Sequence, residues 1–211
     1  MLDLARVDDY ASKIDDAATR MMDLLNDVLD LARLQGGQQL ELERQPTDLV
    51  ALARQVATGQ QQTTDRHRIL VQAPVAELVG LWDAARLERA LANLVSNAIK
   101  YSPHGGEVCL AIEQERRDDG AWAVLHVQDY GIGIPEADLP HVFDRFHRGA
   151  NVFGQISGTG LGLASARQII EQHRGMIGVA SAEGRGARFT LRLPLVTGEV
   201  ADDSRSTPPI S

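Results

Sequence analysis

Residues 157–166 read SGTGLGLASA, a stretch in which glycines alternate with other residues just before a helix-forming run. Gly158, Gly160 and Gly162 present successive backbone N–H groups where a helix from Leu161 is expected to begin. Backbone N–H groups and a helix N-terminus both attract anions, so phosphates can approach this main chain directly. A plain flexible loop before a helix is the alternative interpretation of the same glycines.

Two better-known glycine motifs do not fit this chain. The stretch has no Gly-Lys-Ser/Thr ending, which a P-loop requires. A dinucleotide fingerprint requires a third glycine, but Leu163 and Glu136 stand at that place in the two glycine segments of this chain. Gly158 also does not follow a strand pattern. The glycines therefore point to neither a P-loop nor a dinucleotide-binding fold.

Composition restricts the possible functions. The 211 residues, 44% of them hydrophobic, are enough for one domain with an appendage. A net charge of -8 argues against broad binding to nucleic acid or to an anionic membrane, so any polyanion must meet a local site. No signal peptide and no run of roughly 18 apolar residues is found, which predicts a cytoplasmic chain without membrane contact.

Three regions are expected along the chain. Within residues 1–37, apolar residues repeat every seven positions over 7–34, which predicts a helix that dimerises or docks on another helix. Packing of this helix back on the downstream domain is the alternative. Residues 38–196 alternate strand and helix patterns, and residues 197–211 are expected to be disordered.

The elements of the middle region follow from periodicity and caps. Strands are expected at 40–44, 68–72, 78–81, 107–114, 121–128, 176–182 and 187–195, and helices after the Thr47-Asp48 cap, over 83–100, from Pro135 and over 161–173. This order predicts an α+β fold of two layers.

The helix expected over 83–100 carries an unusual polar face. Asn93, Asn97 and Lys100 are spaced by four and three residues and share one side of the helix, with Tyr101 next to them. An amide oxygen beside an ammonium group suits Mg²⁺ bound to phosphate. A solvated face with incidental asparagines is the alternative.

The segment DYGIGIP, residues 129–135, places an acid at the end of a strand and glycines beside it. The Asp129 carboxylate can accept a hydrogen bond from an exocyclic amine. In the alternative interpretation Asp129 only caps the turn.

Aromatic and basic residues alternate over residues 143–148, in front of the glycine stretch. Phe143 and Phe146 are expected to anchor a lid, while Arg145 and Arg148 reach a γ-phosphate. An aromatic core contact with surface arginines is the alternative.

Four segments, in the order NLVSNAIKYS, DYGIGIP, FDRFHRG and GTGLGLA, resemble the N, G1, F and G2 boxes of the sensor histidine kinase catalytic domain. That domain belongs to the gyrase-type ATPase superfamily. The resemblance covers about residues 45–196, and DLLNDVLDLARLQGG upstream resembles the second helix of the dimerisation and phosphotransfer domain. It implies a Bergerat-type two-layer sandwich, with a mixed sheet and three helices on one face, after a long N-terminal helix.

The resemblance also implies a site with ATP and Mg²⁺ as cofactors. Asn97 would coordinate Mg²⁺, Lys100 would contact phosphate and Asp129 would accept from the adenine amino group. The catalytic residues implied are Asn93, Lys100, Arg148 and, less directly, Arg145. The remaining nucleotide-binding residues implied are Tyr101, Gly131, Gly133, Ile134, Phe146, Gly158, Thr159, Gly160, Leu161, Gly162 and Thr190.

Position 93 distinguishes this sequence from the hydrolysing relatives of the superfamily, which place a glutamate four residues before the metal-binding asparagine. Asn93 is an amide and cannot accept a proton at neutral pH. We therefore expect slow hydrolysis and transfer to a better nucleophile, an imidazole nitrogen.

The acceptor histidine of the family is not found in this sequence. None of the six histidines is followed by an acid, and the His-Glu-Leu-Arg-x-Pro pattern is absent. We expect part of a longer kinase, which can include a membrane anchor, that homodimerises through its N-terminal helix and works with a histidine phosphotransfer domain and a response regulator. A non-catalytic nucleotide-binding and dimerisation module is the alternative function.

Overall fold

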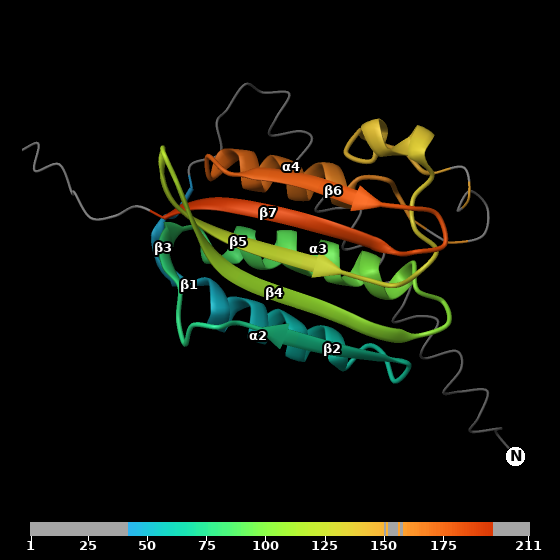
Figure 1. The fold of residues 1–211 in the computed structure, drawn as a ribbon, viewed down its shortest axis with the longest axis horizontal. Helices are drawn as coiled ribbons and strands as arrows, with labels where there is room; N and C mark the ends of the chain where they lie inside the picture. The colour runs from blue at the N-terminus through green and yellow to red at the C-terminus, as the bar shows by residue number, and fades with distance from the viewer. Residues whose placement is uncertain (1–41, 150, 152–155, 157, 196–211) are drawn as a thin grey trace, which may run out of the picture.

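The computed structural model describes residues 42–149, 151, 156 and 158–195. In this part of the chain, helices α2, α3 and α4 cover one face of a five-stranded sheet and leave the other face open (Figure 1). The predicted two-layer α+β architecture is confirmed. The helix expected over 7–34 and the tail 197–211 lie outside the described residues.

The element bounds are close to those expected from the sequence. They are β1 Gln45–Asp48, α2 Leu49–Gln61, β2 His67–Gln72, β3 Val79–Trp82, α3 Ala84–Lys100, β4 Gly106–Arg117, β5 Gly120–Gln128, the 3₁₀ helix η1 Glu136–His141, α4 Gly162–Gln172, β6 Met176–Ser181 and β7 Ala187–Leu195.

The first strand was predicted a few residues too early. It was expected over 40–44, whereas β1 begins at Gln45 and pairs antiparallel with β3. The Glu43 N–H instead donates to Asp83 Oδ2 at 3.1 Å. A backbone donor that is bound to a side chain cannot join a ladder, so the strand starts after it.

The main sheet has the order β2-β4-β5-β7-β6. Strands β2 and β4 are parallel, and the other neighbours are antiparallel. Side chains alternate between the two faces of each strand, so every second residue packs under the helices. In β4, Val108, Leu110 and Ile112 are buried in this way.

Helix α3 lies in the middle of the helical layer (Figure 1). One side of this helix packs in the core, and another side carries the polar face predicted from the sequence. Asp83 caps its N-terminus, with Oδ1 accepting from the Arg86 N–H at 3.1 Å. Its buried residues are Leu87, Ala90, Leu91, Leu94, Val95 and Ala98. Each buried leucine contributes about 2 kcal/mol of transfer free energy, which fixes the rotation of the helix and therefore the direction of its polar face.

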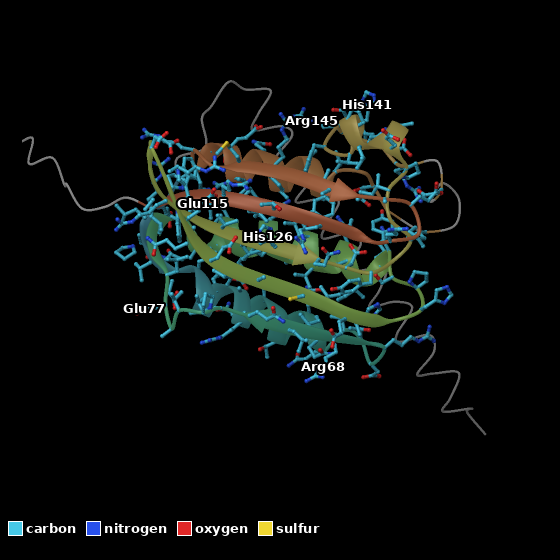
Figure 2. The ribbon with its side chains drawn as sticks, in the orientation of Figure 1. Arg68, Glu77, Glu115, His126, His141 and Arg145 are labelled. Carbon is cyan, nitrogen blue, oxygen red and sulfur yellow. The ribbon has the colours of Figure 1, made fainter. Side chains whose placement is uncertain are left out.

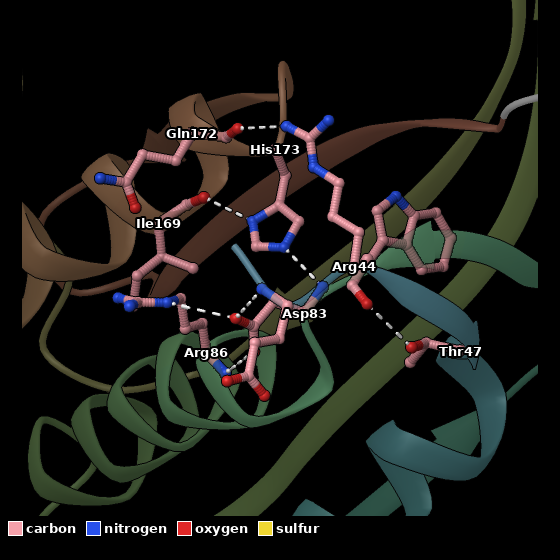
Figure 3. A network of polar contacts seen from close by, with 9 residues as sticks. Arg44, Thr47, Asp83, Arg86, Ile169, Gln172 and His173 are labelled. Carbon is pink, nitrogen blue, oxygen red and sulfur yellow. Dashed lines mark hydrogen bonds and ion pairs between the residues drawn. The ribbon is translucent and has the colours of Figure 1, made fainter. Parts of the chain in front are cut away.

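A buried polar network joins α3 to α4 at the end of these helices farthest from Lys100 and Gly162 (Figure 3). His173 is 3% exposed, and its Nε2 accepts from the Asp83 N–H at 2.9 Å while Nδ1 donates to the Ile169 carbonyl at 2.8 Å. Arg44 adds a bond to the Gln172 carbonyl at 3.1 Å. The network therefore fixes the start of α3 against the end of α4.

Candidate active site

A cavity opens beside the C-terminal end of α3, with a volume of about 90 Å³. It is enclosed by α3, the turn after β5, η1, the segment after η1, the start of α4 and the start of β7. Its lining residues are Asn97, Tyr101, Asp129, Gly133, Ile134, Asp138, Val142, His147, Arg148, Gly149, Asn151, Leu163, Ala187 and Phe189.

Asp129 lies at one end of this cavity and is 4% exposed. Its Oδ1 accepts from the backbone N–H groups of Gly131, at 2.9 Å, and Ala187, at 3.2 Å. Burial raises the pKa of the carboxyl group, although these two hydrogen bonds act in the opposite direction. Oδ2 makes no hydrogen bond within the described part of the chain, so one oxygen fixes the carboxylate and the other is available to a ligand.

The turn after Asp129 needs its glycines because other backbone lies against it. A Cβ at Gly131 would be 2.0 Å from the Tyr101 carbonyl oxygen. Gly133 has a φ of +67°, and a Cβ there would be 2.1 Å from the Ala182 carbonyl oxygen. Both contacts bring the turn against α3 and β6, which closes this end of the cavity.

Two cations lie close together beside the cavity, Arg148 in its wall and Lys100 next to this arginine. Burial lowers the pKa of Lys100, and the positive charge of Arg148 lowers it further. The same arginine lowers the pKa of Tyr101, against the larger upward effect of burial. Two like charges held together in a half-buried place favour an anionic ligand between them.

The glycine stretch lies next to this cationic end. A Cβ at Gly158 would be 2.5 Å from Lys100 Nζ, so the main chain runs directly beside the ammonium group. Thr159 Oγ1 accepts from the Leu161 N–H at 3.2 Å, and Gly160 turns with a φ of +74°. Leu161 itself is buried, so only its backbone is available to a ligand.

Asn97 and Asn93 have different surroundings. Asn97 lines the cavity, and its amide makes no hydrogen bond to the described residues. Asn93 Nδ2 donates to the Gly162 carbonyl at 3.3 Å and so connects α3 to the first residue of α4. This hydrogen bond positions α3 against the helix that follows the glycine stretch.

The single amide oxygen of Asn97 is compatible with Mg²⁺, which does not need a dense set of protein ligands. Mg²⁺ usually takes one or two protein ligands and completes its shell with phosphate oxygens and water. No group of three or more His, Cys, Asp or Glu side chains suited to a metal occurs among the described residues. Any magnesium at Asn97 would therefore arrive with its phosphate ligands.

Of the predicted site residues that do not line the cavity, three are exposed or lie on the other face of the sheet. Thr190 lies on the open face of the sheet, where His126 Nδ1 is 2.9 Å from its Oγ1 (Figure 2). Its neighbour Phe189 lines the cavity, and strand alternation turns Thr190 the other way. Arg145 is exposed. The ring of Phe146 is 65% exposed, so its side chain does not anchor the lid as expected.

Phe143 does anchor this segment. Its ring packs edge-on against Phe189, with 6.3 Å between the centroids and 80° between the planes. The Phe146 backbone contributes instead of its ring, because its N–H donates to the Gly160 carbonyl at 2.9 Å. The contact between this segment and the glycine stretch therefore runs through the main chain.

The structure brings six of the predicted residues together around the cavity: Asn97, Tyr101, Asp129, Gly133, Ile134 and Arg148. It also adds residues that the sequence did not single out: Asp138, Val142, His147, Gly149, Asn151, Leu163, Ala187 and Phe189. Asp138 and His147 are nine residues apart in a segment without regular periodicity, so no spacing rule could have paired them.

Comparison with known families then identifies the domain. The family model described as histidine kinase-, DNA gyrase B- and HSP90-like ATPase matches residues 82–197. This chain belongs to that ATPase family. The match includes the polar face of α3, the Asp129 turn and the glycine stretch, so the family segments are also those that build the cavity.

Relatives of this chain within the ATPase family include sensor histidine kinases. The sensor-like histidine kinase SenX3 of Mycobacterium tuberculosis is 36% identical over 198 residues, covering 93% of this chain and 47% of SenX3. The sensor histidine kinase WalK of Bacillus subtilis is 33% identical over 177 residues, covering 83% of this chain and 28% of WalK. The chain therefore spans less than half the length of these relatives.

Solved structures of histidine kinases have the same fold. Full-length ShkA in complex with AMPPNP superposes with a TM-score of 0.74 at 29% identity, covering 90% of this chain and 39% of ShkA. The mycobacterial sensor histidine kinase MprB superposes with a TM-score of 0.62 at 28% identity, covering 72% of this chain and 97% of that structure. In the described part of this ATPase-family chain, no helix combines the length and hydrophobicity that a membrane span requires.

Proposed function

We propose that this domain binds Mg-ATP and transfers the γ-phosphoryl group to a histidine that lies outside its own catalytic domain. The observation that carries the proposal is that the cavity wall holds both a buried carboxylate with one oxygen available and Arg148, with Lys100 beside this arginine. An adenine nucleotide has the matching polarity, with an amino donor on the base and anionic oxygens on the phosphates.

At the base end, Asp129 Oδ2 accepts from the adenine amino group while Oδ1 stays on the Gly131 and Ala187 N–H groups. Tyr101 and Ile134 supply apolar surface along the base. A fixed, buried carboxylate accepts a hydrogen bond from the adenine amino group but repels a carbonyl oxygen at the same position of another base. It therefore selects adenine.

At the phosphate end, Lys100 and Arg148 bind the anionic oxygens, and the backbone N–H groups of residues 158–162 approach them at the start of α4. Asn97 would hold Mg²⁺ through its amide oxygen, and the ion would neutralise charge on the phosphates. The AMPPNP complex of ShkA supports nucleotide binding by this fold.

Phosphoryl transfer here depends on positioning. The Asn93 amide is bonded to the Gly162 carbonyl and supplies no base, so water in the cavity is poorly activated. An acceptor imidazole brings its own lone pair: a nitrogen–phosphorus bond forms, and the bond from the γ-phosphorus to the bridging oxygen breaks as ADP leaves. Lys100 and Arg148 hold the charge that develops on the oxygens.

The proposed partners follow from the relatives. The acceptor would be carried by a histidine phosphotransfer domain, with a response regulator receiving the phosphoryl group and dimerisation through the N-terminal helix in an intact kinase. The names of the relatives support this assignment in general. We also propose a cytoplasmic location for the domain, where ATP is available.

A second function, nucleotide binding without turnover, is favoured by the lack of an acid after any of the six histidines. Incubation of the chain with a separate SenX3-type phosphotransfer domain and γ-labelled ATP discriminates the two. Acid-labile label on the acceptor histidine supports the kinase. Nucleotide binding without any transfer supports the second function.

Substitution Asn97→Ala tests the metal assignment in the same assay. It removes the amide oxygen from the cavity, so we expect Mg-ATP affinity to fall by about ten-fold or more, with little change for nucleotide in EDTA. Equal affinities of the variant and the unmodified chain for Mg-ATP would refute this role for Asn97.

A further inference from the structure

His147 and Asp138 form a pair on the wall of the cavity that the proposed function does not use. His147 Nε2 lies 3.2 Å from Asp138 Oδ1, and the two side chains are 26% and 16% exposed. Asp138 comes from η1, whereas His147 directly precedes Arg148 in the chain. The pair therefore fixes the residue next to the arginine that faces the phosphate end.

The segment around Arg148 is held at further points on both sides. Gly149 packs on the same acid, because a Cβ there would be 3.1 Å from Asp138 Oδ2. Asn151 Nδ2 donates to the Gly133 carbonyl at 3.2 Å, and the Phe146 N–H donates to Gly160. Of these contacts, only the pair of His147 with Asp138 joins two ionisable side chains.

We propose that His147 and Asp138 are positioning residues, which hold Arg148 toward the terminal phosphate of the nucleotide and do so more strongly when the imidazole is protonated. This inference rests on the proposed function, since it assumes a triphosphate in the cavity. Neither residue is assigned a contact with the reacting atoms. The contact at Nε2 lacks the geometry of a hydrogen bond, so a neutral imidazole gains little from the carboxylate, whereas an imidazolium is attracted to it by charge.

The charges around His147 are of both signs. Asp138 is the carboxylate in direct contact with the ring. His141, whose ring centroid is 5.7 Å away, is itself paired with Asp144 at 2.8 Å, and Arg148 is adjacent in the chain. Asp129 lines the same cavity, and Lys100 lies beside Arg148. An imidazolium is attracted to the carboxylate and a neutral ring is not, so protonation strengthens the pair.

The experiment compares affinities for Mg-AMPPNP and Mg-ADP at pH 6 and pH 8, using the full chain and the variants His147→Gln, Asp138→Asn and the double variant. Loss of this partly buried ion pair should lower the preference for AMPPNP over ADP by about three- to ten-fold at pH 6. The double variant should resemble either single variant, because each removes the same interaction.

The matched control is His126→Gln. His126 also faces a carboxylate, Glu113, at 3.4 Å, but it lies on the open face of the sheet away from the cavity (Figure 2). The titration of the ligands themselves is common to all variants, so the difference between variants measures the role of the pair. Circular dichroism checks that each variant is folded.

The outcomes separate the two proposals. If the unmodified chain binds no nucleotide, the proposed function fails. If it binds but His147→Gln and Asp138→Asn keep its AMPPNP preference and its pH dependence, the inference is overturned while the function stands. Equal losses for AMPPNP and ADP also overturn it, because a merely structural role would affect both ligands alike.

Discussion

Asp129 is placed to serve both the fold and the proposed ligand. Its two oxygens have different partners, since Oδ1 is bound to two backbone N–H groups and Oδ2 makes no bond to the described residues. The backbone bonds fix the carboxylate without consuming its second oxygen. A substitution at this position therefore tests recognition of the base separately from the shape of the turn.

Substitution Asp129→Asn should greatly weaken adenine nucleotide binding. The amide oxygen must remain on the Gly131 and Ala187 N–H groups, so the NH₂ group is turned to the ligand and meets the adenine amino donor. Loss of a hydrogen bond to a charged group costs about 1.5–3 kcal/mol, or roughly 10- to 150-fold in affinity. Calorimetric titration measures the loss, and Glu113→Gln, the same carboxylate-to-amide change at an exposed position beside His126, serves as the folded control. Unchanged affinity would exclude Asp129 from base recognition.

The raised pKa of Asp129 predicts an acid limit for binding. The ligand-binding form is the carboxylate, so affinity falls as the pH drops through the raised pKa of the empty site. Because that pKa lies above the ordinary aspartate value of about 3.9, the loss begins at a higher pH than for an exposed aspartate. A titration with fluorescent ADP from pH 8 to pH 4.5 measures it. Affinity that stays constant over this range would contradict the prediction.

At the scale of elements, the relation between α3 and α4 decides the site, because α3 carries Asn97 and Lys100 while α4 begins beside the glycine stretch. Asn93 connects the two helices near the cavity, and the network of His173 and Asp83 connects their far ends (Figure 3). Both contacts are polar and directional. They fix the relative position of the helices more narrowly than apolar packing alone.

The His173 network predicts a loss of stability in acid. Burial lowers the pKa of His173, so the unfolded state binds more protons between the lowered value and the ordinary one of about 6.5. The free energy of unfolding therefore rises with pH through this window. The contribution of His173 is lost as the pH falls from about 6.5 toward the lowered pKa. The slope from one group cannot exceed about 1.4 kcal/mol per pH unit.

Denaturant unfolding of the unmodified chain and of His173→Gln at pH 5 and pH 7.5 measures this contribution. Glutamine can accept from the Asp83 N–H and donate to the Ile169 carbonyl, but it does not titrate. The variant should therefore lose less stability than the unmodified chain on acidification. An identical pH dependence of the two proteins would remove His173 as the cause.

At the scale of the whole molecule, the proposed function requires an acidic chain to bind a polyanion. The net charge of -8 repels a nucleotide at long range, and the local cations Lys100 and Arg148 must overcome it at the site. Salt screens both effects, but the half-buried pair is screened less. The chain should therefore bind nucleotide at physiological ionic strength without a general affinity for nucleic acid.

The chain alone should hydrolyse ATP slowly, because Asn93 cannot activate water. We expect fewer than about 0.01 turnovers per second, at least a hundred-fold below the ~1 s⁻¹ at the lower end for kinases with their acceptors. A coupled assay of ADP release measures the rate. Rapid multiple turnovers without an acceptor would show that another group activates water.

The elements were largely predictable because periodicity and caps are local. Asp48 and Asp83 cap α2 and α3 as expected, and the two hairpins follow their alternating patterns. The start of β1 was misplaced because a long-range bond from Glu43 to Asp83 ended the ladder. Local sequence contains no information about that partner, which lies forty residues away.

For the site, the sequence by itself determined the chemical groups: the amide-bearing helix, the acid with its glycine turn, the cations and the glycine stretch, each encoded within a few consecutive residues. Only the tertiary structure decided which of them meet. It turned Thr190 to the open face, exposed Arg145 and the ring of Phe146, and brought Asp138 to His147. The physical reason is that strand alternation and the packing of η1 set side-chain directions through contacts between residues far apart in the chain.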